Sequence, residues 1–565
     1  MRRRAELIAI LVLALTGCAS VPTSGPVQHY QPSQGGATSG VQVAPLPPVD
    51  GATQLLIVEG FLHAMGTYQS NYAIARQYLT TQAATNWRPE SGIQVYADGY
   101  PPAETDQSVV LIAPLAGTVD ASGAYSSAGG QVRLDFGLVK NDAGQWRISN
   151  PPPGLLVSKY LFTTGFVAVD AYFASASGAV LLPESRFVPV ADDGITMAVN
   201  DVLAGPTSWL APLVVARPLP DLRATAVTLD SSGVVDVNLP GEATAIDGDQ
   251  RERLLAELTL TLCGFDQVRA IQVRAGGSTW FTADGRTELT PKIFASMDPA
   301  AGTSMRSAYV IADDHLRRQA SEGNWIDLTD VQVGVPKVAS FAISGSTQVW
   351  AGVSQDRTKL ISGPVDGKAN RTLRTGGVLL RPAFARNGEL WSPTTKLTGL
   401  KVYREGAAVP VSVSGVPHGN VAAMALAPDG DRLALVLTQA GVSSVGLLRI
   451  RRSDAGVMLD GWRPVAVDTG VTGTSQILDL SWTSATDLVL LRLGADSQTS
   501  VGVASQDGAI FTEIGPGDAV GLQAIAAVPG RPTLVLTGMG VLYRYDGEFN
   551  WAVASTGVDA VAYPG

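Results

Sequence analysis

Cysteine and histidine are scarce in this sequence, and their scarcity limits the chemistry that the protein can carry. The 565 residues include two cysteines, Cys18 and Cys263, and four histidines. Two thiols cannot build a disulfide framework or a zinc site made of several thiolates. The histidines are spread from His29 to His418, and no pair has the spacing of a metal site. We therefore expect no bound metal and no cofactor.

Charged residues are also few, at 16%, and the formal net charge of −10 is negative. Nucleic-acid binding needs clustered lysine and arginine, so this charge balance argues against a nucleic-acid partner. The 45% of hydrophobic residues is typical of a folded chain. The 61 glycines and 34 prolines indicate many tight turns, which favours β architecture. At roughly 150 residues per domain, the length corresponds to about three or four domains.

The motifs of common enzyme classes are missing from the sequence as well. It has no G-x-S-x-G nucleophile elbow, no phosphate-binding P-loop and no H-E-x-x-H metal motif. Residues 51–160 show no paired carboxylates and no His–Asp set of the kind that general acid–base catalysis uses. The sequence thus predicts no catalytic residues, and we expect a protein that is not an enzyme.

The N-terminus has the pattern of an exported lipoprotein. Three arginines, Arg2 to Arg4, precede an apolar run over 7–15 that is too short to span a bilayer, which takes about 20 residues. The next four residues, Leu15 to Cys18, form a lipobox. The thiol of Cys18 would accept the lipid, and the small residues before it would allow signal peptidase to cleave the chain there. An ordinary signal peptide followed by a chance cysteine is the alternative.

These features place the protein at the cell membrane, on its extracytoplasmic face. Residues 1–17 are predicted to be a signal peptide, and Cys18 the lipidation site. Several acyl chains, palmitate among them, would anchor it stably, because a single chain gives only marginal binding. Residues 18–50 are rich in Pro, Gly and Ser and are predicted to form a flexible tether after the lipidated cysteine.

Residues 51–160 are predicted to form an α+β domain of the NTF2-like or cystatin-like kind. Apolar residues recur at helical spacing over 52–68, and Asn71 is expected to cap a second helix. Strand patterns follow, of which 132–139 and 146–149 are joined by a turn over 141–144.

Residues 161–297 alternate between strand and helix patterns, which predicts an α/β domain. Strands are expected at 167–174, 179–182 and 186–190, and a long helix at 250–262. Arg186 could bind an acidic group of a ligand, but holding a junction between sheet and helix is the favoured role. Cys263, at the end of the long helix, is interpreted as a small buried hydrophobic residue.

Residues 305–565 contain a repeat. Apolar segments that end in small or turn residues recur about every 42 residues, a period typical of propeller blades. The segments are 338–345, 380–388, 421–430, 477–483, 522–530 and 558–565. We predict an all-β propeller of six blades. Its ring is expected to close where Val558–Tyr563 adds to the strands of residues 309–328.

Several segments resemble one known family. Residues 18–27, CASVPTSGPV, resemble the mature start of the actinobacterial LpqB lipoproteins, and the resemblance extends over essentially the whole chain. Residues 182–189, 202–206 and 234–240 resemble the GerMN domain, named from spore-germination proteins. The family is likewise described with a C-terminal β-propeller.

The resemblance implies a partner that residue spacing does not show. Proteins of the LpqB family look like accessory lipoproteins of the MtrA–MtrB two-component system. This chain would then bind the extracellular domain of an MtrB-like sensor histidine kinase and modulate signalling linked to cell-wall homeostasis and division. An envelope-ligand or peptidoglycan-binding scaffold independent of a kinase is the main alternative, and a propeller hydrolase or lyase is a third.

Overall fold

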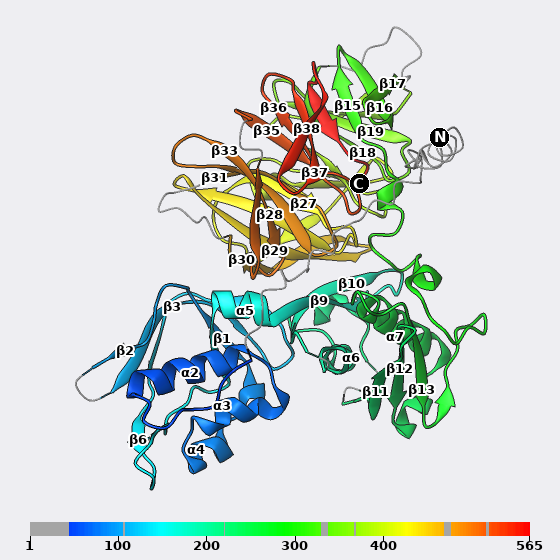
Figure 1. Cartoon of the computed structure of the whole chain (residues 1–565). Coiled ribbons are helices and arrows are strands. Elements are labelled where there is room, and N and C mark those ends of the chain that lie inside the picture. The colour runs from blue at the N-terminus through cyan, green and yellow to red at the C-terminus, as the bar shows by residue number, and fades with distance from the viewer. Residues whose placement is uncertain are drawn as a thin grey trace, which may run out of the picture. The chain divides into compact units, whose positions relative to one another are not determined.

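The computed structural model describes most of the chain after residue 43. The described ranges are 44–105, 108–191, 193–217, 219, 221–328, 337–366, 369–467, 476–515 and 519–565. All of them belong to one compact unit, residues 37–565 (Figure 1). The predicted signal peptide and Cys18 lie outside the described residues. Within those residues, no helix is long and apolar enough to cross a membrane.

The N-terminal domain packs short helices against a curved, mainly antiparallel sheet. Thr53 caps the longest helix by accepting from Leu56 N at 3.3 Å, and the buried face of that helix includes Phe61. The helices are α2 (Gln54–Gly66), η1 (Ser70–Tyr72), α3 (Ala73–Gln77), α4 (Thr81–Asn86) and η2 (Pro89–Ser91). The strands are β1 (Ile93–Tyr96), β2 (Ala103–Glu104), β3 (Val109–Val119), β4 (Tyr125–Ser127), β5 (Gln131–Asp135), β6 (Leu138–Lys140), β7 (Trp146–Ile148) and β8 (Leu155–Ser158).

Two local predictions for this domain are wrong. Asn71 does not cap a helix: its φ is 56°, Tyr72 is also left-handed, and α3 begins only at Ala73 and is five residues long. The strand predicted over 132–139 is interrupted at Gly137, whose φ of 57° ends β5 and starts a separate hairpin of β6 and β7. A positive φ breaks a strand locally, which an apolar pattern does not reveal.

The middle domain contains a two-stranded ribbon, formed by its first two strands, and a mixed sheet covered by helices. Its helices are α5 (Lys159–Gly165), α6 (Gly194–Ala204), η3 (Ala211–Leu213), η4 (Gly241–Ala245), α7 (Gly248–Leu262) and η5 (Pro291–Phe294). Its strands are β9 (Phe166–Ala174), β10 (Leu181–Pro189), β11 (Ala226–Leu229), β12 (Val234–Leu239), β13 (Ala270–Ala275) and β14 (Ser278–Thr279). The four last strands form one sheet in chain order, with β12 and β13 parallel across the α7 crossover.

The sequence patterns explain most of these elements. Asp247 caps α7 by accepting from Gln250 N at 2.8 Å, and Gly205, with a φ of 95°, ends α6 just before a proline. The two strands predicted at 179–182 and 186–190 are in fact one strand, β10, which pairs with β9 along its whole length. Every residue of β10 is buried, so the polar residues at its centre do not mark a turn.

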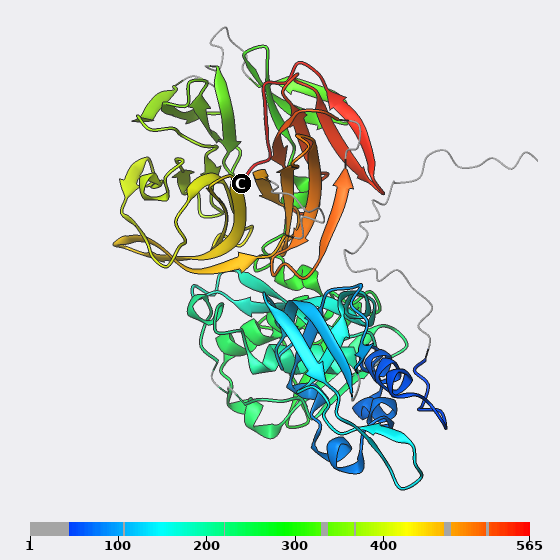
Figure 2. The ribbon, with the colours of Figure 1, turned by 90° about the vertical axis from the view of Figure 1, so that its left-hand side faces the viewer.

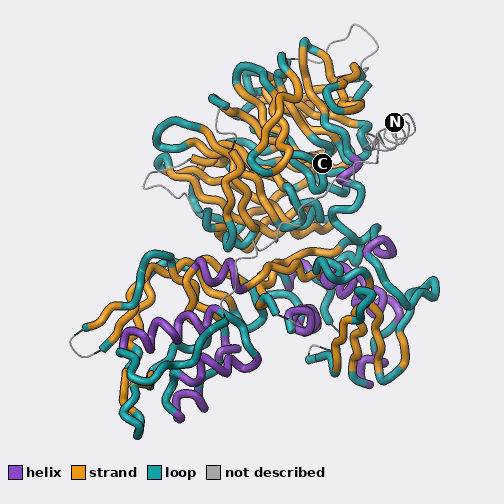
Figure 3. The backbone as a smooth tube through the Cα atoms, viewed as in Figure 1, coloured by secondary structure: helices purple, strands orange, loops and turns teal. Residues whose placement is uncertain are grey.

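The C-terminal residues form the predicted propeller, with strands almost throughout (Figure 3). The first three sheets contain β15 (Tyr309–Ala312), β16 (His315–Ser321), β17 (Asn324–Asp327) and β39 (Ala560–Ala562); β18 (Val338–Ile343), β19 (Val349–Ser354), β20 (Lys359–Pro364) and β21 (Arg371–Thr375); and β22 (Ala383–Phe384), β23 (Leu390–Ser392), β24 (Lys401–Arg404) and β25 (Ala407–Val409). The other three contain β26 (Val411–Val413), β27 (Asn420–Leu426), β28 (Arg432–Gln439), β29 (Val442–Ser453) and β30 (Gly456–Val465); β31 (Gln476–Trp482), β32 (Asp487–Leu493), β33 (Thr499–Ser505) and β34 (Phe511–Gly515); and β35 (Leu522–Ala526), β36 (Leu534–Thr537), β37 (Leu542–Gly547) and β38 (Asn550–Ser555).

The predicted closure of the ring is confirmed. The C-terminal strand β39 pairs antiparallel with β15, and Val561 stands opposite Val310. Figure 2 shows the sheets arranged around an axis, with the C-terminus near the centre. Closure joins the two ends of the repeat and leaves no unpaired inner strand at this sheet.

Candidate functional site

Few of the residues singled out in the sequence have the environment of a reactive group. Cys18 lies outside the described residues. Cys263 is partly buried, and burial raises the pKa of its thiol to about 11, so it stays protonated near neutral pH. Within the described ranges, no group of three or more His, Cys, Asp or Glu side chains could hold a metal ion.

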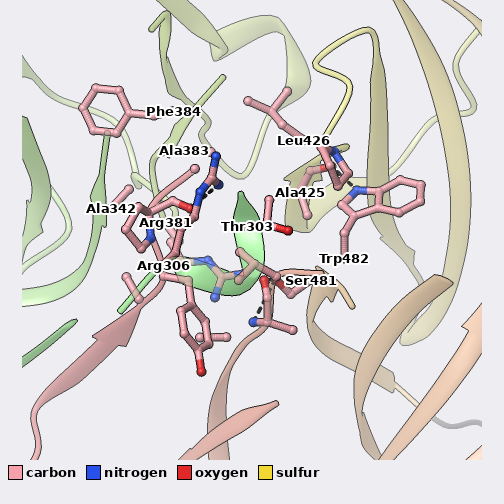
Figure 4. A pocket seen from close by; sticks show the side chains of 18 of the residues that line it. Thr303, Arg306, Ala342, Arg381, Ala383, Phe384, Ala425, Leu426, Ser481 and Trp482 are labelled. Atoms are coloured by element: carbon pink, nitrogen blue, oxygen red, sulfur yellow. Dashed lines mark hydrogen bonds between the residues drawn. The ribbon is translucent and has the colours of Figure 1, made fainter. Parts of the chain in front are cut away.

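A small cavity of about 120 Å³ lies where the innermost strands of the propeller meet (Figure 4). The guanidinium group of Arg381, one of the arginines that line the cavity, binds both carboxylate oxygens of Asp479 at 2.9 and 3.0 Å. The same group donates to the backbone oxygens of Leu480 and Ile525. Burial raises the pKa of Asp479, and the charge of Arg381 opposes that shift. These two charged groups are therefore bound to each other and act as a cross-link between sheets.

The segment that leads into the propeller lies against the same cavity. Thr303, in the short helix η6 (Thr303–Met305), donates from Oγ1 to Pro529 O at 2.7 Å. Arg306 donates from Nη1 to Pro564 O at 2.7 Å. Both side chains are labelled in Figure 4. These bonds fix the connection from the middle domain to the propeller.

Arg432 joins the propeller to the middle domain. Its side chain is fully buried, and its guanidinium binds Asp429 at 2.6 and 2.9 Å. It also donates to the backbone oxygens of Pro183 at 3.1 Å and Ala485 at 2.8 Å, and to the side-chain oxygen of Gln506. Pro183 belongs to β10, so a single guanidinium connects two turns of the propeller to the ribbon of the middle domain.

Buried carboxylates lie beside this contact. Thr486 donates from Oγ1 to Asp170 Oδ2 at 3.0 Å, again linking propeller and ribbon. Ser127 of the N-terminal domain donates from Oγ to Asp507 O at 3.1 Å. Burial raises the pKa of both Asp170 and Asp507. Hydrogen bonds oppose the shift in both, and so does the charge of a nearby arginine, which is Arg432 for Asp170 and Arg463 for Asp507. All three domains thus meet at a region where carboxylates are costly to ionise.

This region is expected to make stability depend on pH. Burial, together with the charges of Asp170 and Asp507, raises the pKa of Asp487 to about 7, although Ser484 donates to it at 2.7 Å. The usual value is about 3.9, so the folded protein holds a proton that the unfolded chain releases. Stability should therefore fall as the pH rises from about 4 to 7. We expect a lower melting temperature at pH 7.5 than at pH 5.5.

The control for this prediction is a pair of matched substitutions. Asp487→Asn should reduce the decrease in melting temperature between pH 5.5 and 7.5. Asp356 is an exposed aspartate whose pKa is lowered by hydrogen bonds from Ser354 and Thr358. Asp356→Asn should therefore show the same decrease in melting temperature between pH 5.5 and 7.5 as the wild type. An unchanged decrease in the Asp487→Asn variant would contradict the assignment.

Arg186 has the structural role that the sequence favoured. It is 1% exposed and binds Glu184 at 2.8 Å and the backbone oxygen of Gly205, which ends α6, at 3.3 Å. It also donates to Ser122 O of the N-terminal domain at 3.1 Å. The guanidinium is engaged by protein groups, so it connects the ribbon to a helix end and to a second domain.

Sequence reasoning missed Arg432, which holds the propeller to the middle domain. Asp429 lies among the turn residues that end the predicted repeat segment 421–430, but its partner Arg432 was not singled out. An acidic and a basic residue three positions apart across a turn were the available signal. Nothing local pointed to Pro183, which is 249 positions away from Arg432 in the chain.

A second, larger cleft of about 960 Å³ separates parts of the middle domain and the propeller. It is lined by the turn between β9 and β10, by η3, by turns of the propeller that carry Arg386 and Asp431, and by Arg451 and Arg452 near the end of β29. Arg452 binds Asp431 at 2.7 Å and the buried Glu389 at 2.9 Å. Mixed apolar and charged linings of this size at domain interfaces are typical of ligand sites.

Comparison with known proteins covers most of the chain. The family described as "Lipoprotein LpqB, N-terminal domain" matches residues 47–163, and "Lipoprotein LpqB beta-propeller domain" matches residues 318–564. Between them, "Sporulation and spore germination" matches residues 170–279. The three matches follow the order of the domains described above.

Whole proteins match as well. Lipoprotein LpqB of Cutibacterium acnes is 30% identical, over 99% of this chain and 98% of that protein. Lipoprotein LpqB of Streptomyces coelicolor is 28% identical, over 100% of this chain and 98% of that protein. Among solved structures, TolB from Acinetobacter baumannii is 14% identical with a TM-score of 0.35, over 48% of this chain and 69% of that one. From its similarity to the Cutibacterium acnes protein over nearly the full length of both, the chain belongs to the LpqB lipoprotein family.

Proposed function

We propose that this chain is a lipid-anchored accessory protein of a two-component system. In this proposal, lipid on Cys18 holds it on the extracytoplasmic face of the cell membrane. There it binds the extracellular domain of an MtrB-like sensor histidine kinase and modulates signalling linked to cell-wall homeostasis and division. The observation that carries the proposal is the relationship to LpqB lipoproteins along 99% of the chain.

The geometry of the described residues supports a binding role rather than a catalytic one. The cavity at the centre of the propeller is small, and Arg381 in its wall is bound to Asp479. Buried bonds from Arg186 and Arg432 hold the three domains together. Domains fixed to one another in this way would present a continuous surface to a protein partner.

Binding is tested with purified ectodomains. A chain starting at residue 19 should be retained by the immobilised extracellular domain of the kinase from the same organism. The extracellular domain of an unrelated sensor kinase is the control and should not retain it. If the two ectodomains do not bind each other, either in solution or on membranes, the kinase proposal is wrong.

The cleft between the middle domain and the propeller favours a second candidate function. A volume of about 960 Å³ with apolar and charged walls suits an envelope-ligand or peptidoglycan-binding scaffold that acts independently of a kinase. This candidate would take precedence if the ectodomains do not bind while the cleft does bind a ligand.

Anchoring is tested separately at the predicted lipobox. Cys18→Ser removes the thiol that would accept lipid, so the variant should no longer fractionate stably with membranes. Ala19→Ser, a neighbouring change that keeps the thiol, should fractionate like the wild type. Mass spectrometry that finds an unmodified Cys18 on the membrane-bound mature protein would contradict lipidation.

A further inference from the structure

One wall of the cleft described above is the edge of a sheet. The short strand β26 stands at the end of its five-stranded sheet and pairs in parallel with β30, Val411 opposite Val457. Pro410, Val411 and Ser412 all line the cleft. A strand with one unpaired edge offers backbone donors and acceptors to another extended chain.

The direction of the backbone groups of β26 follows from its pairing. Val457 N donates to Pro410 O at 2.9 Å, and Ser414 N donates to Leu459 O at 2.9 Å. Successive residues of a strand point their backbone groups to opposite sides. Residues 410, 412 and 414 therefore face β30, and Val411 directs its N–H and C=O away from it, to the free edge.

The charged wall of the cleft suits an anionic group. The Arg451 side chain is 45% exposed; its Nε lies 3.3 Å from Asp460 Oδ2, and its Nη2 donates to the sulfur of Met458 at 3.2 Å. Arg452, the next residue of β29, points to the opposite face of the sheet, where it binds Asp431 at 2.7 Å and Glu389 at 2.9 Å. Arg451 is therefore the guanidinium available to an anionic group of a ligand. Planar guanidinium groups match carboxylates well.

The apolar part of the lining completes the site. Val180 and Leu213 come from the middle domain, and Val457 and Met458 from the start of β30. Side chains of an extended peptide alternate in direction, so every second one would meet such a surface. Edge strand, apolar walls and guanidinium groups thus lie in one cleft.

We propose that this cleft binds an extended peptide with a free carboxyl terminus. The peptide adds to the free edge of β26, and its terminal carboxylate is held by Arg451. Alternate side chains of the peptide pack on the apolar walls. This proposal does not rest on the proposed binding of a kinase.

The probe is a pool of fluorescein-labelled hexapeptides in which serine alternates with Val, Leu or Ala. One pool ends in a free carboxylate and the other in a carboxamide. With the chain from residue 19, we expect saturable fluorescence polarisation for the carboxylate pool and at least about tenfold weaker binding for the carboxamide pool, because a neutral end loses the charge-assisted bonds.

Two variants test the two parts of the site. Arg451→Gln should reduce affinity for the carboxylate pool about tenfold and leave that for the carboxamide pool unchanged. Val411→Pro removes an outward N–H and should weaken both pools. Arg357→Ala, at an exposed arginine of a propeller turn outside the cleft, is the matched control and should bind like the wild type. Melting curves establish that each variant is folded.

The proposal is overturned if the wild type shows no saturable binding, or if both pools bind it equally. It is also overturned if folded Arg451→Gln and Val411→Pro proteins both bind like the wild type. Retention by the kinase ectodomain is measured on the same variants. Unchanged retention with lost peptide binding keeps the two functions distinct, so either one can fail alone.

Discussion

Replacing Arg432 with alanine should lower the free energy of unfolding by about 3–5 kcal/mol, because the change leaves a buried charge without its partner. Asp429 has no exposed side-chain surface and is held by two bonds from this guanidinium. The backbone oxygens of Pro183 and Ala485 lose a donor as well. Denaturant unfolding of the chain from residue 19 measures the loss.

A double-mutant cycle separates the ion pair from the rest of the contact. Asp429→Ala combined with Arg432→Ala should cost less than the sum of the two single changes, since neither charge is then left alone. Arg357→Ala, at an exposed site of the propeller, should change the unfolding free energy by less than about 0.5 kcal/mol. Additive single and double changes would show that the two side chains do not act as a pair.

The propeller was predictable from the sequence because its signal is repetitive. Each apolar segment of the repeat forms or begins an inner strand, as in 421–430 with β27 and 522–530 with β35. The closing strand was predictable for a related reason: a lone segment at 558–563 needs a partner, and β15 provides it. Patterns with a fixed period survive local irregularities, and one-residue errors at the strand ends do not change the fold.

The contacts that join the domains were not predictable in this way. Asp170 and Thr486 are 316 positions apart, and neither has a neighbour in sequence that marks it as a contact residue. The prediction left residues 183–185 outside the strands, whereas Glu184 lies within β10, is buried and is paired with Arg186. A polar residue in a sequence usually indicates an exposed position, but these residues are buried, partly against another domain. Only the tertiary structure reveals that burial.

Deleting residues 558–565 should destabilise the propeller severely, because it opens the ring. Val558, Val561 and Tyr563 are 3–8% exposed, and burying a side chain of this size contributes about 1.5–3 kcal/mol. A typical domain is stable by only about 5–15 kcal/mol, so losing the burial of these three side chains removes much of the free energy of unfolding. The edge of β15 also becomes unpaired. We expect a melting temperature lowered by more than about 10 °C, or aggregation, for residues 19–557 compared with 19–565.

A point substitution distinguishes closure from a general effect of shortening the chain. Val561→Asp places a charge opposite Val310 in the closing pair and should reproduce most of the loss, since an unpaired buried charge is very unfavourable. Val553→Asp, on the outer strand β38 at a residue that is 59% exposed, is the matched control and should melt like the wild type. If the shortened chain and the Val561→Asp variant both remain monomeric and melt with the wild type, β39 does not stabilise the ring.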